Sequence, residues 1–257
     1  MSPLSLHLQT SNPKLLQDVL NAVNALTDEA TLQFNSAGVK IAVMDPSRVA
    51  MIDATLPSTT FDTYTYTCSE PRKIGVNITE LLTYLKRADK NETATLTITP
   101  ENQLNIAITG HYNRNFNTPI LTPSTEECPE PKVDYTVKAK TETAGLHRFF
   151  EDVQLVSDHV TIKTENEKFT LTAKEDAKTA EITLDTNHGL LSLEAEAKQV
   201  SKAIYSLSYL SEIVKAAKPL SDLVTLEYAS DMPVKIDFLP VSNSTAKLTF
   251  YLAPRIE

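Results

Sequence analysis

The chain carries a long internal repeat, and this feature limits its possible folds more than any other. When the sequence is shifted by 130 residues, Val23–Phe34 lies over Val153–Thr164, and apolar residues alternate in phase as far as Ile52 and Ile182. The identical pairs in this overlap are Val23/Val153, Asp28/Asp158 and Thr31/Thr161. A repeat of this length predicts two similar structural units that share one order of elements.

Residues 119–132, near the middle of the chain, have the composition of a connector. They include four prolines and three glutamates and show neither a helical nor a strand period. A proline-rich, polar stretch of this kind favours an extended connector. We therefore predict an N-terminal domain at 1–118 and a C-terminal domain at 133–257, which suits a length of 257 residues.

Apolar and polar residues alternate in many short segments of both halves. The segments are 39–43, 95–98, 104–108, 169–171, 180–184, 224–228, 234–238 and 248–250. Strands with one apolar and one polar face are typical of antiparallel sheets that are solvated on one side. Polar residues at Glu101-Asn102 and Asp231-Met232-Pro233 predict hairpin connections.

Two amphipathic helices are predicted in each half. The first runs from about Pro13 to Leu26, the second starts at Asn77, the third follows Thr143, and the fourth follows Ser208. Glu80 lies three residues after Asn77, which is the spacing of a capping box. The predicted fold class is therefore α+β, with two pseudo-repeated domains of antiparallel sheets and helices.

Composition excludes several classes of protein. The net charge of -9 argues against a protein that grips nucleic acid by positive charge alone. No apolar run is long enough for a membrane helix, and the first eleven residues predict no secretory signal. Two cysteines exclude a disulfide scaffold and favour a reducing intracellular compartment, either cytoplasm and nucleoid or, in a eukaryote, the nucleus.

The sequence predicts no catalytic site, no metal site and no cofactor. The five glycines are too few and too far apart for a phosphate loop, a dinucleotide fingerprint or a nucleophile elbow. His147 has Phe150 and Glu151 at the positions where a second metal ligand would lie on a helix, and one carboxylate does not make a site. The remaining enzyme hypothesis is a hydrolase built around Cys68, which full function of Cys68→Ser would reject.

Basic residues nevertheless gather on the predicted helices. Lys86 and Lys215 fall at equivalent places in the two halves, although ordinary solvated helix faces would explain single lysines as well. The basic residues on or next to the predicted helices are Lys14, Lys86, Arg87, Lys90, Arg148, Lys215 and Lys218. A weakly basic surface on an acidic protein predicts loose, non-specific contact with phosphate. Retention on DNA would then depend on topology rather than on affinity.

Two motifs resemble those of a known family. The segment Gly38–Asp53, which contains Met-Asp-Pro-Ser-Arg-Val, closely resembles the signature of the proliferating cell nuclear antigen (PCNA) family of DNA sliding clamps, and its Asp-Pro-Ser-Arg form is archaeal-like. The segment Phe250–Glu257 is similar to the terminal strand and tail of that family. Other matches fall in family order at Phe61–Tyr64, Ile74–Asn77, Leu85-Lys86 and Tyr209-Leu210, so the resemblance covers essentially the whole chain.

The resemblance implies a trimeric ring that encircles double-stranded DNA without sequence preference, with helices lining the hole and sheets outside. It implies partners that bind through short peptide motifs, namely DNA polymerase, clamp loader, nuclease and ligase, and no membrane partner. The residues that resemble the family's peptide pocket are Met44, Val49, Met51, Cys128, Pro129, Ser206, Pro233, Tyr251, Leu252, Ala253, Pro254 and Arg255. Such a pocket takes apolar anchors of the partner, while nearby backbone extends the pairing.

The resemblance also implies DNA contacts at Arg72 and Lys73, within the segment Cys68–Lys86, and edge-to-edge subunit contacts. The contact strands are about Tyr112–Thr118, with Tyr112, Arg114 and Phe116, and Asp176–Leu184, with Lys178, Ala180 and Ile182. Several positions depart from the family pattern. Gln17 and Asp18 stand where basic residues are frequent, Ser69 and Ala54 are atypical, and the connector is unusually polar.

These departures keep other hypotheses open beside the homotrimeric clamp. One is a subunit of a heterotrimeric clamp, and another is a checkpoint-type clamp that serves as an interaction scaffold and does not support polymerase. The size of the isolated protein in solution distinguishes a homotrimer from a subunit of a heterotrimer. Primer extension on long templates distinguishes a processivity clamp from a checkpoint-type clamp.

Overall fold

The repeat in the sequence is matched by a repeat in the order of helices and strands. The computed structural model describes residues 6–68, 70–125, 128–195, 200–239 and 245–255. The first run of elements is β1 (Leu6–Thr10), α1 (Pro13–Asn24), β2 (Glu29–Asn35), β3 (Gly38–Met44), β4 (Ala50–Pro57), the short 3-10 helix η1 (Ser58–Thr60), β5 (Thr63–Tyr66), β6 (Arg72–Asn77), α2 (Ile78–Leu85), β7 (Thr93–Ile98), β8 (Gln103–Thr109) and β9 (Arg114–Pro119).

The second run follows the same order of strands and helices. It consists of β10 (Val137–Glu142), α3 (Thr143–Gln154), β11 (His159–Glu165), β12 (Lys168–Glu175), β13 (Lys178–Leu184), β14 (Ser192–Ala195), β15 (Ser201–Ser206), α4 (Leu207–Ala217), β16 (Leu223–Tyr228), β17 (Val234–Leu239) and β18 (Lys247–Leu252). The starts of α1, β2 and β3 precede those of α3, β11 and β12 by 130 residues, so the predicted shift is confirmed.

Each run forms sheets with the same strand order. The first run contains a five-stranded sheet in the order β5-β1-β7-β8-β9, and its counterpart in the second run is β14-β10-β16-β17-β18. The order β6-β2-β3-β4 is likewise matched by the four-stranded sheet β15-β11-β12-β13. The pairings within these sheets are antiparallel, as the alternating apolar residues predict. The α+β class with two repeated units is therefore confirmed.

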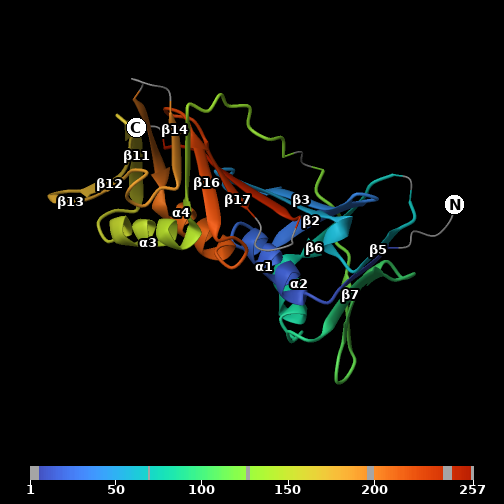
Figure 1. The fold of residues 1–257 in the computed structure, drawn as a ribbon. Helices are drawn as coiled ribbons and strands as arrows, with labels where there is room; N and C mark the ends of the chain where they lie inside the picture. Colours follow the sequence, from blue (N-terminus) through green and yellow to red (C-terminus); the bar gives the residue numbers. More distant parts are fainter. Residues whose placement is uncertain (1–5, 69, 126–127, 196–199, 240–244, 256–257) are drawn as a thin grey trace. The chain divides into compact units, whose positions relative to one another are not determined.

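Contacts divide the chain into two compact units. Unit 1 comprises Met1–Pro46, Ile52–Cys128 and Ser242–Leu248, and unit 2 comprises Ser47–Met51, Pro129–Val241 and Thr249–Glu257. Within each unit the two helices lie side by side, α1 with α2 and α3 with α4 (Figure 1). The apolar stripe of each helix is buried against a sheet, as Leu20 and Val23 of α1 and Leu146 and Phe150 of α3 illustrate.

The turns and helix ends follow the local sequence. Asn102 and Asp231 adopt positive φ angles of 58° and 55° in the β7–β8 and β16–β17 connections, where short polar side chains tolerate this conformation. Asn77 caps α2 by accepting from the backbone N–H of Glu80 at 2.8 Å. The predicted capping box is only half formed, because the Glu80 carboxylate binds Tyr84 and Thr118 instead.

Three boundaries predicted from the sequence differ in the structure. Helix α4 begins at Leu207, before Ser208, and strand β9 begins at Arg114, two residues after Tyr112. The connector 119–132 is not free of β structure, because Pro119 ends β9 and Leu121 forms an isolated antiparallel bridge with Gly75. Residues 126–127 of the connector, Ser69, and the last two residues of the C-terminal motif lie outside the described part of the chain.

Candidate nucleic-acid and peptide interfaces

Cations gather at the carboxyl end of the second helix in each unit. Lys86 is the C-cap of α2, and Arg87 and Lys90 follow it. Lys215 lies in the last turn of α4, and Lys218 is its C-cap. All five side chains are exposed. Cations at this end of a helix interact favourably with its dipole, so the placement stabilises the helix and also presents positive charge to solvent.

The first helix of each unit adds little positive charge. Lys14 of α1 forms an ion pair with Asp18, and the exposed Arg148 of α3 is followed by the exposed acids Glu151 and Asp152. The four helices with their C-caps are electrically balanced, with Lys14, Lys86, Arg148, Lys215 and Lys218 against Asp18, Glu80, Glu151, Asp152 and Glu212. The helices are thus neutral in a chain of net charge -9.

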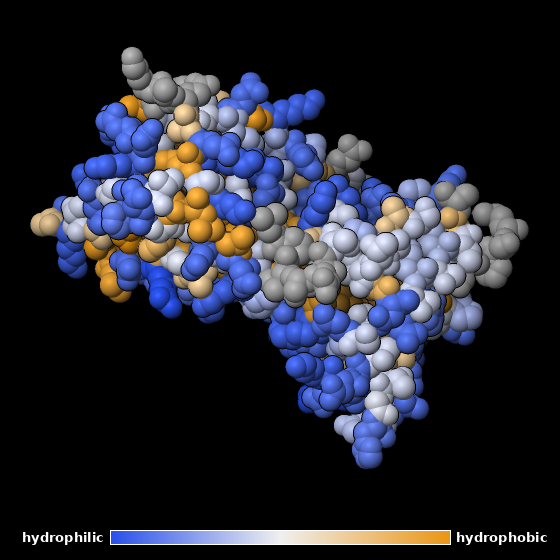
Figure 2. Space-filling model, in the orientation of Figure 1, coloured by the Kyte–Doolittle hydropathy of each residue, from blue (hydrophilic) through white to orange (hydrophobic). Residues whose placement is uncertain are grey.

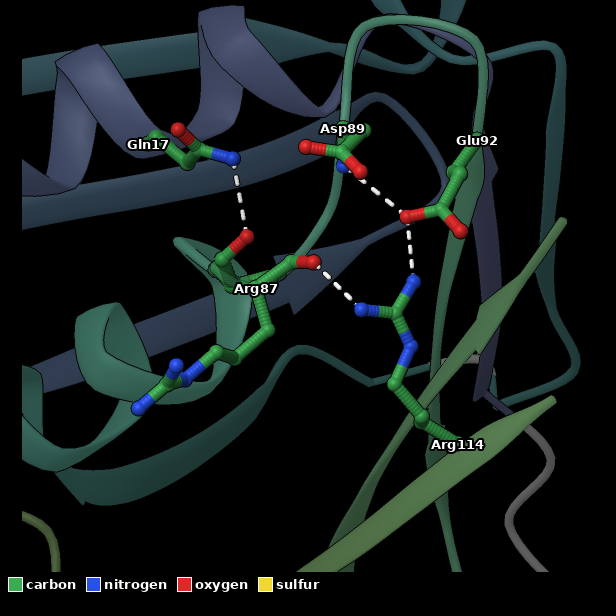
Figure 3. A network of polar contacts seen from close by, with 6 residues as sticks. Gln17, Arg87, Asp89, Glu92 and Arg114 are labelled. Carbon is green, nitrogen blue, oxygen red and sulfur yellow. Dashed lines mark hydrogen bonds and ion pairs between the residues drawn. The ribbon is translucent and has the colours of Figure 1, made fainter. Parts of the chain in front are cut away.

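The acidic and amide residues on α1 have a structural explanation. Gln17 is buried, and its Nε2 donates to the carbonyl of Leu85 at 2.8 Å, which joins α1 to the end of α2 (Figure 3). Asp18 is also buried and pairs with Lys14. Position 17 therefore serves the packing of α1 against α2 in this structure.

Arg72 and Lys73 do not join the helix cations. They open β6, whose other end leads into α2, and five residues of strand span roughly 16 Å. The Arg72 guanidinium donates to Oδ1 of Asn102 at 3.2 Å, in the β7–β8 turn. Both side chains are exposed, but the structure places them apart from Lys86 and its neighbours.

Strand β9, predicted to form a subunit contact, is the last strand of its five-stranded sheet. Its Arg114 side chain turns inward, donating to the Arg87 carbonyl at 2.5 Å and forming an ion pair with Glu92 (Figure 3). The backbone N–H of Asp89 donates to the same Glu92 carboxylate at 2.9 Å and, with Arg114, lowers the pKa of Glu92. The Arg87 side chain itself points away from this network (Figure 3).

Phe116 of β9 also faces its own unit. Its ring stacks on that of Tyr84 in α2, with centroids 4.7 Å apart. Thr118 donates to Glu80, and Tyr84 and Thr118 together lower the pKa of that carboxyl. Tyr112 remains exposed, and the guanidinium carbon of Arg114 lies over its ring, 4.6 Å from the ring centroid. The side chains of Arg114 and Phe116 are therefore engaged within unit 1, which leaves the backbone of β9 and its exposed Asn115 and Asn117 available to a neighbour.

Strand β13 is the corresponding edge in unit 2. It is the last strand of the four-stranded sheet and pairs with β12 from Phe169↔Leu184 to Glu175↔Lys178. Ala180 and Ile182 are half-buried on the face that also carries the buried Leu184, while Lys178 is exposed. As on β9, alternate side chains face inward, the others are exposed, and the outer backbone edge is open within the described residues.

The C-terminal motif is fixed by backbone hydrogen bonds in unit 2. The N–H of Ala253 donates to the Val49 carbonyl at 2.8 Å, and the N–H of Arg255 donates to the Ile204 carbonyl at 2.7 Å. Ala253, Pro254, Arg255 and Val49 remain at least partly exposed. The segment after β18 is thereby held between two other parts of unit 2, where its side chains are accessible.

Two of the predicted pocket residues require correction. Met51 and Leu252 are buried, with 2% and 0% exposure, so they pack in the core and do not line an open surface. Tyr251 is nearly buried too, and burial raises the pKa of its hydroxyl. Pro233 and Ser206 are half-buried in unit 2, and Pro129 is exposed there. Met44 and Cys128 are half-buried members of unit 1.

The structure adds residues that the sequence did not indicate. Tyr135 lies close enough to Tyr251 to perturb it, and burial raises the pKa of Tyr135 to about 12. Lys235 bridges Glu227 at 3.1 Å and Asp237 at 2.8 Å beside both tyrosines. Burial lowers the pKa of Lys235, but the two carboxylates outweigh burial and raise it. Their signal in the sequence is limited to a few charges on largely apolar strands, namely Glu227 in β16 and Lys235 and Asp237 in β17.

The surface is mostly polar. On the face drawn in Figure 2, apolar side chains gather mainly on the part of the chain that carries α3 and α4. Large apolar residues exposed in this unit include Leu155 and Leu191. Among the described residues, no group of three histidine, cysteine or acidic side chains could hold a metal ion. None of the helices described here is long and apolar enough to cross a membrane.

Comparison with known proteins covers nearly the whole chain. The model for the proliferating cell nuclear antigen N-terminal domain matches residues 5–117, and the model for its C-terminal domain matches residues 129–255. The chain is 33% identical over 249 residues to a DNA polymerase sliding clamp from Nitrosopumilus maritimus, covering 97% of this chain and 98% of that one. It is 34% identical over 245 residues to one from Thermococcus gammatolerans, covering 95% and 96%.

Two solved structures are also similar. A PCNA from Thermococcus kodakaraensis matches with a TM-score of 0.87 and 26% identity, covering 97% of this chain and all of that one. A chain of the PCNA2–PCNA3 complex from Sulfolobus tokodaii matches with a TM-score of 0.85 and 29% identity, covering 98% and 100%.

Proposed function

Because the chain belongs to the proliferating cell nuclear antigen family, we propose that it is a DNA sliding clamp, a trimeric ring that encircles duplex DNA and tethers DNA polymerase. The observation that carries this proposal is the strand-for-strand repeat, in which two units of one design each pair two helices against sheets. A ring built from such units has pseudo-equivalent positions around its circumference. The domain boundaries at 118 and 133 belong to the same proposal.

The charge distribution supports retention by encirclement. The helices are neutral and the rest of the chain is acidic, so the protein lacks the charge that a tight phosphate contact requires. The exposed Lys86, Arg87, Lys90, Lys215 and Lys218 would make loose contacts with passing phosphates. Lys14 and Arg148 lie beside acidic residues and contribute less, and Arg72 and Lys73 would contact DNA apart from the helices.

The open edges of β9 and β13 support the proposed subunit contact. An unpaired edge offers a row of backbone donors and acceptors to another chain. A head-to-tail contact between β9 of one subunit and β13 of the next would use both edges. Exposed side chains beside this contact include Tyr112, Asn115, Asn117, Lys178 and Glu181, while Arg114, Phe116, Ala180 and Ile182 shape it from within.

The C-terminal segment supports binding of short partner peptides. Its accessible residues Ala253, Pro254 and Arg255 flank the nearly buried Tyr251, and Pro233 and Ser206 lie in the same unit. DNA polymerase, the clamp loader, a nuclease and a ligase would bind here through peptides that combine a helical turn with aromatic anchors. In this proposal the protein performs no catalysis of its own.

Two measurements test the proposal. Light scattering of the purified chain is expected to give a trimer at micromolar concentration. Primer extension with a cognate polymerase and loader is expected to give longer products when the protein is added. Unchanged product length would reject the processivity role, even for a protein that forms rings.

A heterotrimeric clamp is the second candidate. The similarity to a chain solved as a complex of two different PCNA chains favours it, as does the neutral helix surface. A monomer or dimer in light scattering would reject the homotrimer and support this candidate. Formation of a trimer on addition of a sister chain would then complete the test.

A further inference from the structure

The start of the connector is attached to the sheet of unit 1 by one backbone bridge and one hydrogen bond to a side chain. Gly75 N donates to the Leu121 carbonyl at 3.1 Å, and Leu121 N donates to the Gly75 carbonyl at 2.8 Å. Just beyond, Ser124 N donates to Oγ1 of Thr31 at 2.9 Å. Because β6 is the last strand in the order β4-β3-β2-β6, Leu121 binds on its open side.

Gly75 is required for this close approach. A Cβ atom at position 75 would lie 2.8 Å from the Thr122 carbonyl oxygen and 2.9 Å from that of Leu121. Real Cβ atoms do not come this close to backbone oxygens, and a backbone cannot swing aside as a flexible side chain can. A glycine within a strand commonly marks such an approach by another segment of chain.

Two prolines prevent the attachment from growing into a ladder. In an antiparallel ladder the doubly hydrogen-bonded pairs recur at every second residue, so the pairs next to Gly75↔Leu121 would be Lys73 with Pro123 and Asn77 with Pro119. Proline has no N–H and cannot complete either pair. The backbone pairing with β6 is therefore limited to Leu121, at the centre of a proline-flanked segment, and the Ser124 contact with Thr31 lies just beyond it.

We propose that Gly75, Leu121 and Pro123 are positioning residues for the partner peptide. The single backbone bridge between Gly75 and Leu121 fixes where the connector leaves unit 1, and Pro123 prevents the following residues from pairing with β6. This inference rests on the proposed peptide-binding function, because Cys128 and Pro129 of the connector belong to the predicted peptide surface. The bridge and the neighbouring Ser124 contact define where the connector leaves the sheet, and a longer ladder on β6 would shift that point along the connector.

Hydrogen exchange of the Leu121 amide, with affinity for a synthetic peptide, tests this inference on the full chain. The peptide carries two adjacent aromatic residues in a helical turn. Gly75→Ala is expected to speed exchange at Leu121 at least tenfold and to weaken peptide binding at least threefold. Leu121→Pro removes the same donor without altering β6, so it provides the test if Gly75→Ala does not fold. Gly145→Ala is the matched control, because its Cβ would meet no atom closer than 3.7 Å.

The opposite change is Pro123→Val, which supplies the missing N–H opposite Lys73. It is expected to slow exchange at Leu121, to protect the new amide at 123, and to lower the association rate of the peptide. Unchanged exchange at Leu121 in Gly75→Ala and in Pro123→Val would overturn the bridge. Altered exchange with unaltered peptide binding would overturn the positioning role alone. Failure of the unaltered protein to bind any such peptide would overturn the peptide-binding function, while exchange would still report on the bridge.

Discussion

Replacement of Lys86, Lys215 and Lys218 together by glutamine separates their possible role at DNA from their role at helix ends. All three side chains are exposed at the carboxyl end of a helix, where each stabilises the helix dipole by about 0.3 kcal/mol. Each phosphate contact that is lost lowers the slope of log binding constant against log salt by about 0.9. That slope corresponds to about 3.5-fold in the binding constant over a fourfold change in salt.

The assay is fluorescence anisotropy of a labelled duplex between about 50 and 200 mM salt, the range over which counterion release is commonly resolved. Replacement of Lys168, Lys202 and Lys247 by glutamine provides the matched control, because these side chains are equally exposed and lie on strands β12, β15 and β18. The helix variant is expected to lower the slope by at least about 0.9 relative to the control variant. Equal slopes in the two variants would show that the helix cations contact no phosphate. A large loss of stability in the helix variant alone would show that these three lysines act mainly by stabilising the fold.

Three further substitutions test the packing around the candidate interfaces. Gln17→Met is expected to destabilise unit 1 by about 1 kcal/mol in urea unfolding, because the Leu85 carbonyl loses one donor but keeps the N–H of Ala88 at 2.9 Å; a loss above about 3 kcal/mol would contradict this. Glu80→Gln is expected to lower stability at neutral pH, because a lowered pKa stabilises the fold fully above the ordinary value of 4.5. The difference is expected to shrink as the pH falls from 4.5 towards the lowered pKa of the folded state and to vanish below it, where a persisting difference would refute the prediction. Gly145→Ala is expected to stabilise unit 2 by up to about 1 kcal/mol through helix propensity, because the added Cβ would make only ordinary van der Waals contacts, the nearest at 3.7 Å; a lower melting temperature would contradict this.

Periodicity in the sequence was sufficient to predict the repeat, the four helices and most strands. These features depend on many residues at regular spacing, so a boundary error of one or two residues, as at Leu207, leaves them intact. The burial of Met51 and Leu252 could not be separated from pocket lining, because apolar residues in a motif fit either role. Fold-level patterns average over many contacts, whereas a pocket depends on which of a few apolar side chains reaches the surface.

Contacts between distant residues left no periodic signal. The Glu80 carboxylate was expected to complete a local capping box, but Thr118, 38 residues away, lies within 2.7 Å and binds it. Arg114 was assigned to a neighbouring subunit, yet Glu92 draws its guanidinium inward. In both cases the partner is distant in the sequence: Glu92 lies 22 residues from Arg114, and Thr118 lies 38 residues from Glu80. Only the folded structure brings each pair together, so the sequence alone does not indicate the contact.

The prolines that flank Leu121 bear on subunit assembly as well as on the connector. Pro119 is the last residue of β9 and has no N–H to offer on the open edge, so a neighbouring strand can pair only with the residues before it. That restriction limits the registers in which the edge of β13 could add to β9. Since the inward side chains of β9 are already bound to α2 and the loop after it, the register must be set by the backbone and by the exposed Asn115 and Asn117. A proline at the end of the edge then stops a slipped pairing from continuing into the connector, where Leu121 is needed by Gly75.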